Sequence, residues 1–488
     1  MKSRIIFILL VPAFLFSQEA VQFDNYFIDK TMRIDYFHVG DAKEEIITVD
    51  QIYEQGIWAG SRMHLVDPFN NGKYCVKVYD VASNRLIYSK GFGSYFGEYQ
   101  TTDSAVRGVK RTYHESALIP YPKHPILFVL EGRDRTNIPH PIFTERIDPS
   151  SIQIIKEKPP ADVRVYEAHK NGDPHRNVDF VWIAEGYAEE EYGKFKKDVD
   201  RYVNVLFSQE PYKSHKDRFN ITGVFKPSAE SGVDEPRQSV YRNTAVSASF
   251  NALNLDRYLL TEDNKAYRDI ASRVPYDAIV ILVNSERYGG GGIYNFYTVS
   301  TVDHALSENV FLHEMGHALV GLADEYYSSD VSYNEFYPKG VEPLEPNITA
   351  LLDPSNIKWK TLLSQGIDVP TDWGKEGVER LQAEMRKISQ EMQKKVAQLK
   401  EDGAAEEALE KERASFGERS KIVGEELQRV RSDYAFLQGK VGVFEGAGYA
   451  AKGLYRPELN CMMFSNERKE FCRVCQDAIV RMIRHYSE

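Results

Sequence analysis

The pattern of hydrophobic and polar positions divides the chain into regions of different character. Between residues 20 and 155, short apolar or alternating segments such as 73–80 and 125–130 are separated by Asn-Gly pairs, prolines and other turn residues. Strands spaced in this way are typical of antiparallel sheets. The pattern therefore predicts an amino-terminal antiparallel β-sandwich domain over residues 18–155.

After the polar, proline-marked segment 156–161, the pattern changes to that of an α/β protein. Continuous apolar runs predict buried strands, and apolar residues at helical spacing predict helices. The strands are expected at 178–184, 275–284 and 293–300, and the helices at 189–207 and 307–320. The whole chain is thus expected to be α+β, with an α/β domain over residues 162–488.

A run of four glycines, Gly289–Gly292, precedes the strand predicted at 293–300. No Gly-Lys-Ser or Gly-Lys-Thr follows it, which excludes a phosphate-binding loop. We interpret the glycines as part of a rim strand that a peptide backbone can approach closely. His304, a little further on, is expected to be an ordinary surface or core histidine.

Residues 374–432 form a charged segment within the second domain. It has as many basic as acidic residues, no proline, and two stretches in which apolar residues recur at steps of three and four. This pattern predicts two long amphipathic helices in an antiparallel coiled-coil hairpin that turns near Gly403. A solvated structural insertion is the favoured interpretation. An arm that contacts a partner or restricts substrates is the alternative.

The first residues predict export. Lys2 and Arg4 precede an apolar run that ends at Phe16, and Ser17 and polar residues follow. This is the pattern of a secretory signal peptide, here at residues 1–17. The apolar run is too short to span a membrane. We therefore expect a protein that is secreted or held in the periplasm or at the cell surface, with no stable membrane insertion after cleavage.

The charge of the chain excludes one class of partner. With 61 basic and 72 acidic residues, the formal net charge is −11. An acidic chain repels the phosphates of nucleic acids before any contact can form. We therefore expect no nucleic-acid partner.

The most informative residues are His313, Glu314 and His317, which stand in the sequence His-Glu-Met-Gly-His. On a helix, positions i and i+4 share one face, so both imidazoles can bind one metal ion. Neutral imidazole suits zinc, which lowers the pKa of a water molecule to about 7. The motif therefore predicts one zinc ion per chain, with Glu314 as the general base.

A third ligand is expected soon after the motif. Gly321 can end the helix and reverse the chain, which would bring Asp324 or Glu325 back towards the metal. Asp324 is the preferred ligand, and the other carboxylate of the pair is expected to orient a histidine. The spacing is one residue longer than in the metzincin pattern, and the candidate ligand is a carboxylate.

Cys461, Cys472 and Cys475 lie close together in sequence, and Cys75 stands apart from them. In an exported protein, a local disulfide or buried free thiols are the favoured interpretation. A structural zinc site would need a fourth ligand, and His485 is the only histidine nearby in sequence. Metal binding or redox catalysis by these cysteines is the less favoured alternative.

Taken together, these residues resemble the secreted IgA-peptidase (igalysin) family of zinc metallopeptidases, which has an amino-terminal β-domain. The resemblance extends from about residue 20 to 485, apart from the charged insertion. The matching segments are 313–317, 321–326, 441–449, 452–457, 461–464 and 471–475. The resemblance implies a metzincin-like zinc endopeptidase with His313, His317 and Asp324 as ligands and Glu314 as base.

Residues further along the chain fit roles in such a site. Met462 or Met463 fits a methionine-containing turn that forms an apolar floor beneath the histidines. Tyr449 and Tyr455, with Tyr326 as a third candidate, are predicted to offer a phenol that stabilises the oxyanion of the reaction. Packing is the alternative role for each of these tyrosines.

The predicted function is therefore that of a secreted zinc-dependent endopeptidase. Its expected substrate is a protein or glycoprotein, and immunoglobulin-like substrates are included. One alternative is a catalytically inactive surface module that binds protein or glycan, although the intact His313, Glu314 and His317 argue against it. Another is a zinc amidase that acts on cell-wall peptide, because a metal-activated water attacks any suitably placed amide.

Overall fold

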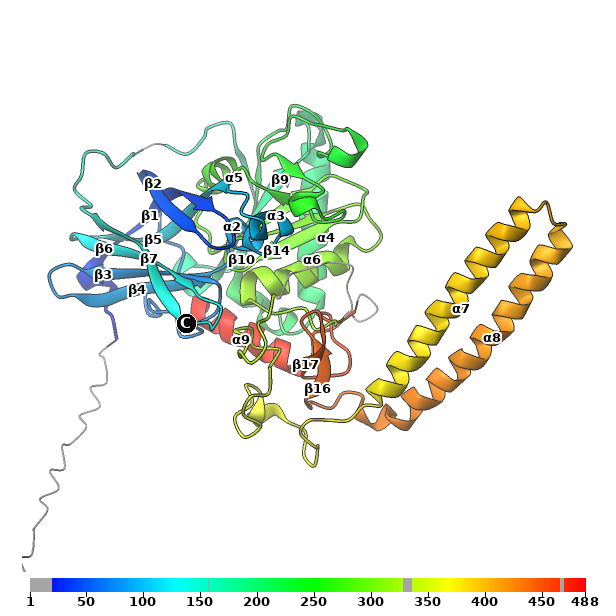
Figure 1. Ribbon diagram of the computed structural model, residues 1–488. Helices are drawn as coiled ribbons and strands as arrows, with labels where there is room; N and C mark the ends of the chain where they lie inside the picture. The colour runs from blue at the N-terminus through cyan, green and yellow to red at the C-terminus, as the bar shows by residue number, and fades with distance from the viewer. Residues whose placement is uncertain (1–19, 157, 328–335, 466–468) are drawn as a thin grey trace, which may run out of the picture.

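The computed structural model describes residues 20–156, 158–327, 336–465 and 469–488. The signal peptide predicted at residues 1–17 lies outside these ranges. The described chain forms an amino-terminal region of sheets, a mixed sheet with helices, and a helical hairpin that projects from the body of the molecule (Figure 1). None of the described helices combines the length and the hydrophobicity that a membrane crossing requires.

The amino-terminal region consists of two antiparallel sheets that share one hydrophobic core. One sheet has the strand order β2-β1-β5 and the other the order β4-β3-β6-β7. The strands are β1 (Phe27–Gly40), β2 (Glu45–Glu54), β3 (Tyr74–Asp80), β4 (Arg85–Phe92), β5 (Arg111–Pro122), β6 (Ile126–Arg133) and β7 (Pro139–Ile147), accompanied by the short helices α1 (Phe23–Tyr26), α2 (Tyr95–Gln100) and α3 (Asp103–Val106). Positions along β3 alternate between buried and half-buried, as in a strand with one face on a core. The antiparallel character predicted for this region is confirmed.

A six-stranded mixed sheet with the order β14-β15-β13-β9-β10-β8 forms the centre of the second part of the chain. Its four central strands run parallel, and its two edge strands are antiparallel to their neighbours. The strands are β8 (Arg164–His169), β9 (Val178–Glu185), β10 (Phe219–Phe225), β13 (Ala278–Val283), β14 (Gly290–Ile293) and β15 (Tyr297–Thr301). Two short pairs lie outside this sheet: β11 (Ala248–Ser249) with β12 (Leu260–Thr261), and β16 (Phe444–Ala447) with β17 (Ala450–Arg456).

The prediction of a single strand at residues 293–300 is wrong. The chain instead reverses at Asn295, whose φ is 51°, and forms the antiparallel pair β14–β15. Asparagine adopts this left-handed conformation more readily than most other residues. Gly290, Gly291 and Gly292 therefore belong to β14, at the edge of the sheet.

The sheet is buried on both faces. The helices around it are α4 (Tyr192–Ser208), α5 (Asn264–Ala271), α6 (Ser307–Met315) and α9 (Arg473–Ser487). Successive side chains of a strand point to opposite faces. Accordingly, Val181 and Ile183 of β9 join the core of the amino-terminal sheets and α5, whereas Phe180 and Trp182 join the core beneath α4, α6 and α9. The two parts of the chain thus share a continuous hydrophobic core.

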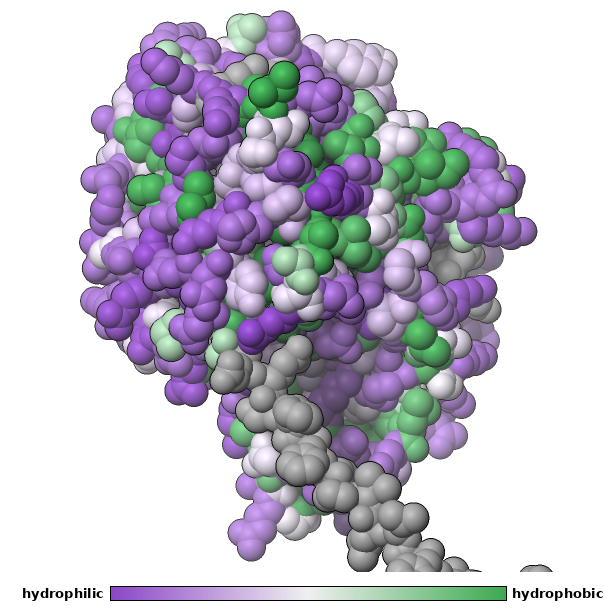
Figure 2. Space-filling model, turned by 90° about the vertical axis from the view of Figure 1, so that its left-hand side faces the viewer, coloured by the Kyte–Doolittle hydropathy of each residue, from purple (hydrophilic) through white to green (hydrophobic). Residues whose placement is uncertain are grey.

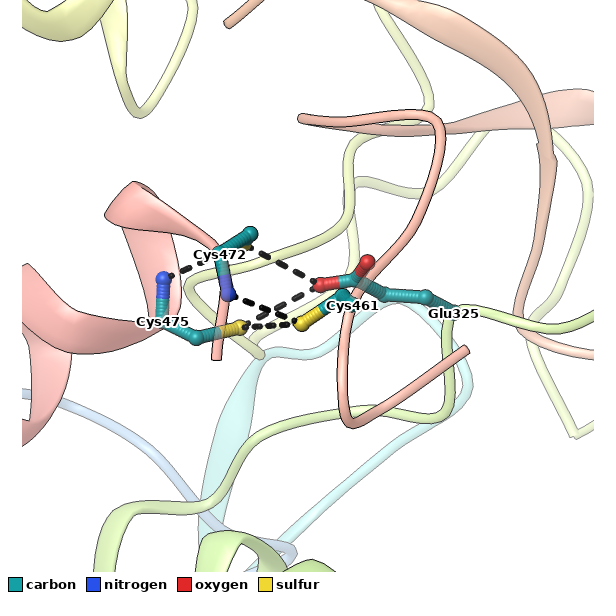
Figure 3. Close-up of side chains that lie close together, drawn as sticks. All are labelled: Glu325, Cys461, Cys472 and Cys475. Carbon is teal, nitrogen blue, oxygen red and sulfur yellow. Dashed lines mark hydrogen bonds between the residues drawn. The ribbon is translucent and has the colours of Figure 1, made fainter. Parts of the chain in front are cut away.

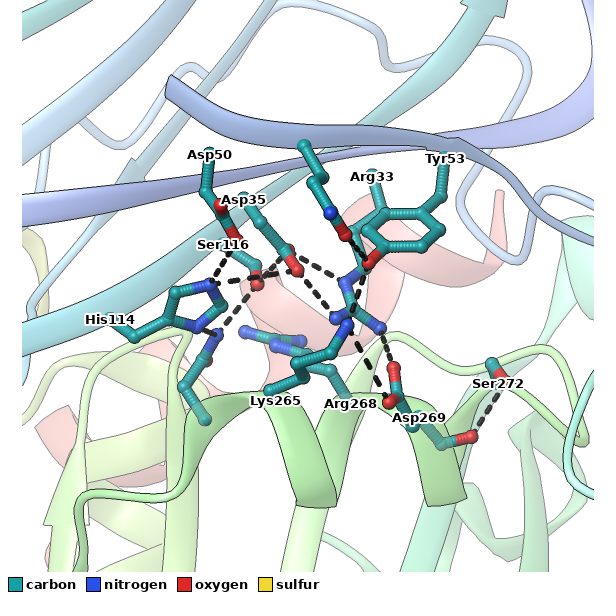
Figure 4. Close-up of polar contacts among 12 residues, drawn as sticks. Arg33, Asp35, Asp50, Tyr53, His114, Ser116, Lys265, Arg268, Asp269 and Ser272 are labelled. Atoms are coloured by element: carbon teal, nitrogen blue, oxygen red, sulfur yellow. Dashed lines mark hydrogen bonds and ion pairs between the residues drawn. The ribbon is translucent and has the colours of Figure 1, made fainter. Parts of the chain in front are cut away.

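Polar contacts also join the two parts of the molecule (Figure 4). The buried guanidinium of Arg33 on β1 donates to Asp35 at 2.7 and 2.5 Å, and to Asp269 on α5 at 2.6 Å. Lys265 of the same helix donates to the hydroxyl of Tyr53 on β2 at 2.6 Å. Carboxylates from both parts of the chain therefore hold Arg33.

The hairpin consists of α7 (Lys375–Glu401) and α8 (Glu406–Asp433), joined by a turn in which Gly403 has φ 68°. The two helices predicted from the charged, periodic segment are therefore confirmed. Apolar residues from both helices form a small core between them. At the base, the ammonium of Lys375 donates to the carbonyl of Ala451 and lies 3.1 Å from Glu445. These contacts attach the hairpin to the β16–β17 pair.

The side of the molecule formed by the amino-terminal sheets is mainly hydrophilic, with scattered hydrophobic residues (Figure 2). Apolar residues that are exposed singly are normal on a protein surface. The candidate functional residues predicted from the sequence lie elsewhere, on α6 and in the turn after it.

Candidate metal centre and substrate cleft

Helix α6 and the turn after it carry the His-Glu-Met-Gly-His sequence. The α-helix ends at Met315, and residues 316–320 continue it as a wider, π-helical turn. Gly321 ends this turn with φ at 71°, a conformation that glycine adopts without a steric penalty. The rings of His313 and His317 lie 4.8 Å apart, and the chain turns back past them, as the sequence predicted.

Three side-chain atoms converge beside this turn. His313 Nε2 lies 3.1 Å from His317 Nε2. Asp324 Oδ1 lies 3.0 Å from the first nitrogen and 3.4 Å from the second. Zinc bonds of about 2.0–2.1 Å place neighbouring nitrogen and oxygen ligands of a tetrahedral site about 3.3 Å apart. The three atoms therefore have the spacing of one face of a zinc tetrahedron.

Backbone carbonyls hold the other nitrogen of each histidine. His313 Nδ1 lies 3.1 Å from the carbonyl oxygen of Met462, and His317 Nδ1 lies 2.6 Å from that of Leu322. Because a carbonyl oxygen only accepts, both Nδ1 atoms carry a proton, so Nε2 is the atom through which each ring, in its neutral form, can bind a metal ion. Two imidazole nitrogens and a carboxylate oxygen that converge in this way can hold a cation between them, and this set of donor atoms fits zinc.

Burial and charge have opposite effects on the pKa values of Asp324 and His317. Burial opposes ionisation of Asp324, but the charges and hydrogen bonds of His317 and His313 outweigh it and hold the pKa of Asp324 well below its ordinary value. Burial likewise disfavours the charged form of His317, but Asp324 outweighs it and raises the pKa of His317 to about 10. Asp324 is therefore held in the ionised form that a metal ligand requires.

Glu325 turns away from the histidines. It is fully buried, accepts a hydrogen bond from Asn347 Nδ2 at 3.1 Å, and lies against the thiols of Cys472 and Cys475. The structure thus brings Asp324, the preferred carboxylate of the pair, to the histidines. Backbone carbonyls, rather than Glu325, orient the two rings, so that expected role of the second carboxylate is wrong.

Glu314 lines the same cavity as both histidines. Burial raises the pKa of its carboxyl above the ordinary value, against the opposing influence of His313 and His317. The carboxylate is therefore close to the candidate metal centre and partly shielded from water, as a general base requires.

The glycines of β14 let this edge strand pack closely on α6. A Cβ atom on Gly292 would lie 2.4 Å from the carbonyl oxygen of Glu314, and one on Gly290 would lie 2.6 Å from Val310. The outer edge of β14 at Gly290 already forms a bridge with Tyr258. The glycines therefore serve helix packing. Gly290 and Gly292 also line the cavity, and access for a peptide backbone stays a prediction.

The predicted tyrosines separate into two groups. Tyr326 and Tyr449 line the cavity with their rings 5.4 Å apart, and the hydroxyl of Tyr449 donates to Asp324 Oδ2. Tyr455 lies on β17, pairs with Thr349 through the backbone, and packs against the hydrophobic core of the second part of the chain. The structure therefore does not bring Tyr455 to the cavity.

The remaining candidates have ordinary environments. Met462 and Met463 are buried, and Met463 lies against Gly316 within the motif, so both contribute to the apolar surroundings of the histidines. His304 Nδ1 accepts a hydrogen bond from the backbone N–H of Leu306. It lies outside the residues that line the cavity, as expected.

The cavity above the histidines has a volume of about 990 Å³, and its walls come from parts of the chain that are distant in sequence. Lys73 and Glu98 come from the amino-terminal region, and Gln382 and Arg386 come from α7. Burial raises the pKa of Glu98 to about 7. Sequence reasoning missed these four residues, because no local motif connects them to the histidines.

Two family models match the chain. The one described as IgA Peptidase M64 covers residues 166–483, and the one described as Peptidase M64 N-terminus covers residues 22–144. No curated protein matches it. The resemblance found in the sequence is therefore confirmed: the chain belongs to the IgA peptidase M64 family, whose members are metallopeptidases.

Proposed function

We propose that the protein is an exported zinc-dependent endopeptidase that hydrolyses peptide bonds of proteins or glycoproteins. The observation that carries this proposal is the convergence of His313, His317 and Asp324 on one point beside Glu314. The cavity around them is large enough for several residues of an extended substrate. The family description makes an immunoglobulin one substrate to test.

In this proposal, His313, His317 and Asp324 hold one zinc ion in a metzincin-like site. When bound, zinc supplies a Lewis acid that polarises the scissile carbonyl and lowers the pKa of a water molecule to about 7. Glu314 accepts the proton of the attacking water and transfers it to the leaving amine. The carbonyls of Met462 and Leu322 keep both histidines in the tautomer that binds metal.

The two tyrosines of the cavity have different roles in this proposal. Tyr449 donates to Asp324, so we assign it to positioning that carboxylate. Tyr326, on the same wall, is the candidate for the phenol that stabilises the oxyanion.

Glu314→Gln tests the proposal. The amide cannot accept a proton, so the variant is expected to keep zinc and to lose cleavage by about 10²- to 10⁴-fold. Zinc would be measured by elemental analysis, and cleavage with a library of unfolded proteins. A variant that retained most of its activity would contradict the assignment of Glu314, even with metal bound.

The wild-type protein in the same assay separates the alternatives. Cleavage of unfolded proteins supports an endopeptidase. Hydrolysis of cell-wall peptide without protein cleavage would point to an amidase. Zinc binding with no hydrolysis of either substrate would point to an inactive binding module.

A further inference from the structure

Figure 3 shows a second group of potential metal ligands. It consists of Glu325, which directly follows Asp324 in the chain, and of the cysteines Cys461, Cys472 and Cys475. All four side chains are buried, with at most 4% of their surface exposed. One ligand atom from each residue lies within 4.8 Å of the other three.

The distances between these atoms fit a tetrahedral zinc site. Cys461 Sγ lies 3.8 Å from Cys475 Sγ, and Glu325 Oε1 lies 3.2 Å from Cys475 Sγ and 3.7 Å from Cys472 Sγ. Zinc–sulfur bonds of about 2.3 Å and zinc–oxygen bonds of about 2.0 Å give edges of about 3.8 Å between sulfurs and about 3.5 Å between sulfur and oxygen. The cluster therefore has the size of a zinc coordination sphere.

The same geometry argues against a disulfide. A disulfide holds its sulfurs about 2.05 Å apart, and all four cysteines of the chain are free thiols. Pairing any two of the three clustered cysteines would leave the third buried beside Glu325. The free, buried thiols were one of the two states favoured from the sequence.

The backbone around the sulfurs favours thiolates. Cys472 caps the amino terminus of α9, and its Sγ accepts from the N–H of Cys475 at 3.4 Å. Cys461 Sγ accepts from the N–H of Cys472 at 3.1 Å. Donors and the positive end of a helix stabilise a thiolate, which is the form that binds metal.

The environment of Glu325 is independent evidence for a cation at this cluster. Its Oε2 is buried and has no hydrogen-bond partner among the described residues. Burial of a carboxylate is costly unless a positive charge or a metal ion offsets it. The buried guanidinium of Arg456 interacts electrostatically with Glu325 and Cys461 and would balance part of the negative charge of three thiolates and a carboxylate.

We propose that Glu325, Cys461, Cys472 and Cys475 bind a second zinc ion, which has a structural role. Four protein ligands close the tetrahedron and leave no open position for a substrate. Binding would release the three thiol protons to solvent. The ion would join the turn that carries Asp324, the segment that carries Met462 and the start of α9.

The proposed ion would also stabilise the backbone segments that position the ligands of the first site. Glu325 N donates to the carbonyl of Met463 at 2.8 Å, while the carbonyl of Met462 accepts from His313. Asp324, which directly precedes Glu325, is the third candidate ligand of the first site. This inference concerns a different site and does not depend on the proposed peptidase activity.

Counting bound zinc in the full-length protein tests the proposal. The wild type is expected to contain two equivalents, His317→Ala one, and Cys475→Ser one. Cys75→Ser is the matched control, since Cys75 lies outside the cluster, and it should retain two. A single equivalent that is lost in His317→Ala and retained in Cys475→Ser would overturn the proposal, as would an intact mass lowered by the two hydrogens of a disulfide.

A second measurement covers the case in which Cys475→Ser does not fold. His317→Ala would be loaded with cobalt(II), which reports thiolate ligands through charge-transfer absorption in the near ultraviolet. We expect this absorption in His317→Ala, and its absence would overturn the proposal. Neither measurement uses peptide cleavage, so failure of the proposed peptidase function would be seen separately.

Discussion

The hydroxyl of Tyr449 donates to Asp324 Oδ2, the oxygen that points away from the histidines. The backbone supports this contact, because the N–H of Gly448 donates to the carbonyl of Asp324 and that of Tyr449 to the carbonyl of Tyr326, each at 3.0 Å. Tyr449 itself has φ 62°, a conformation that costs a non-glycine residue about 1 kcal/mol or more. The surrounding contacts therefore hold Tyr449 in an unusual conformation beside a candidate ligand.

Tyr449→Phe tests this positioning role. The variant keeps the ring and loses the donated hydrogen bond, so we expect zinc affinity at the first site to fall by roughly 10- to 100-fold. Competition with a chromophoric chelator measures the affinity. Tyr455→Phe, in which the ring lies on β17 outside the cavity, is the matched control and should bind zinc as the wild type does. Equal affinities for the two variants would contradict the role.

Asp179 and Asp277 form a pair of neighbouring carboxyl groups. Asp277 Oδ2 accepts from the backbone N–H of Asp179 at 2.9 Å, and Asn220 donates to Asp179 Oδ1 at 2.9 Å. Burial, and then the charge of Asp277, raises the pKa of Asp179, and burial raises the pKa of Asp277. Folding therefore favours the protonated form of this pair.

Asp179→Asn tests that conclusion. A carboxyl with a raised pKa stabilises the folded state below its ordinary pKa of about 4 and loses this contribution as the pH rises through the folded-state value. We expect the variant to gain stability relative to wild type as the pH rises from about 5 to about 8.5, by about 1.4 kcal/mol for each pH unit that lies below the raised pKa of Asp179. Calorimetry at both pH values measures the difference. The exposed Asp162→Asn is the control, and a pH-independent difference for Asp179→Asn would contradict the expectation.

At the scale of elements, the hairpin has two ends with different surroundings. Near its base, Gln382 and Arg386 line the cavity, and Lys375 is attached to the β16–β17 pair. Its far end extends away from the body of the molecule (Figure 1). The solvated insertion favoured from the sequence describes the far end, whereas the base contacts the rest of the domain.

Two deletions distinguish the contribution of the far end of the hairpin from that of its base. Replacing residues 393–412 with a short Gly/Ser turn should leave the melting temperature, the zinc content and short-peptide cleavage close to those of the wild type. Replacing residues 374–431 should lower the melting temperature, because it removes the buried contacts of Lys375 and of the hairpin core. Thermal unfolding and elemental analysis measure both outcomes. Loss of zinc in the shorter deletion would show that the far end contributes to the site.

Elements with a strong periodic pattern could be predicted from the sequence. The helices of the hairpin and the strand β9 are examples, because their apolar spacing has one reasonable interpretation. The β14–β15 reversal could not be predicted, since the conformation of Asn295 divides an apolar run without changing its composition. The π-helical turn at 316–320 also has no distinctive spacing. It depends on how the chain after Gly321 packs.

On the scale of the whole molecule, the amino-terminal sheets are part of the support for the candidate site. They cover one face of the mixed sheet, and α6 packs on the other. Arg33 couples the two parts, because it is fully buried and interacts with Asp35 on its own strand and with Asp269 on α5. Removing one member of a buried ion pair leaves the other charge without compensation.

Arg33→Ala should therefore destabilise the whole protein. We expect the free energy of unfolding to fall by about 3–5 kcal/mol, because the buried Asp35 loses its partner. Lys30→Ala is the control, since its exposed pair with Glu54 should contribute at most about 1 kcal/mol. Denaturant titration measures both variants. A similar small effect for the two would mean that Arg33 does not couple the parts of the molecule.

The candidate site could be predicted as far as it is local in sequence. His313, Glu314, His317 and the choice between Asp324 and Glu325 lie within one short segment. The walls of the cavity and the partners of Glu325 come from segments that are far apart, and Glu325 is 147 residues from Cys472. No spacing in the sequence encodes such neighbours, so only the folded chain identifies them.

The carbonyl that orients His313 belongs to Met462, 149 residues later in the chain. A ribosome must therefore complete most of the protein before this histidine is held in place. A product of premature termination before that point would contain the entire His-Glu-Met-Gly-His sequence without the support for its first histidine.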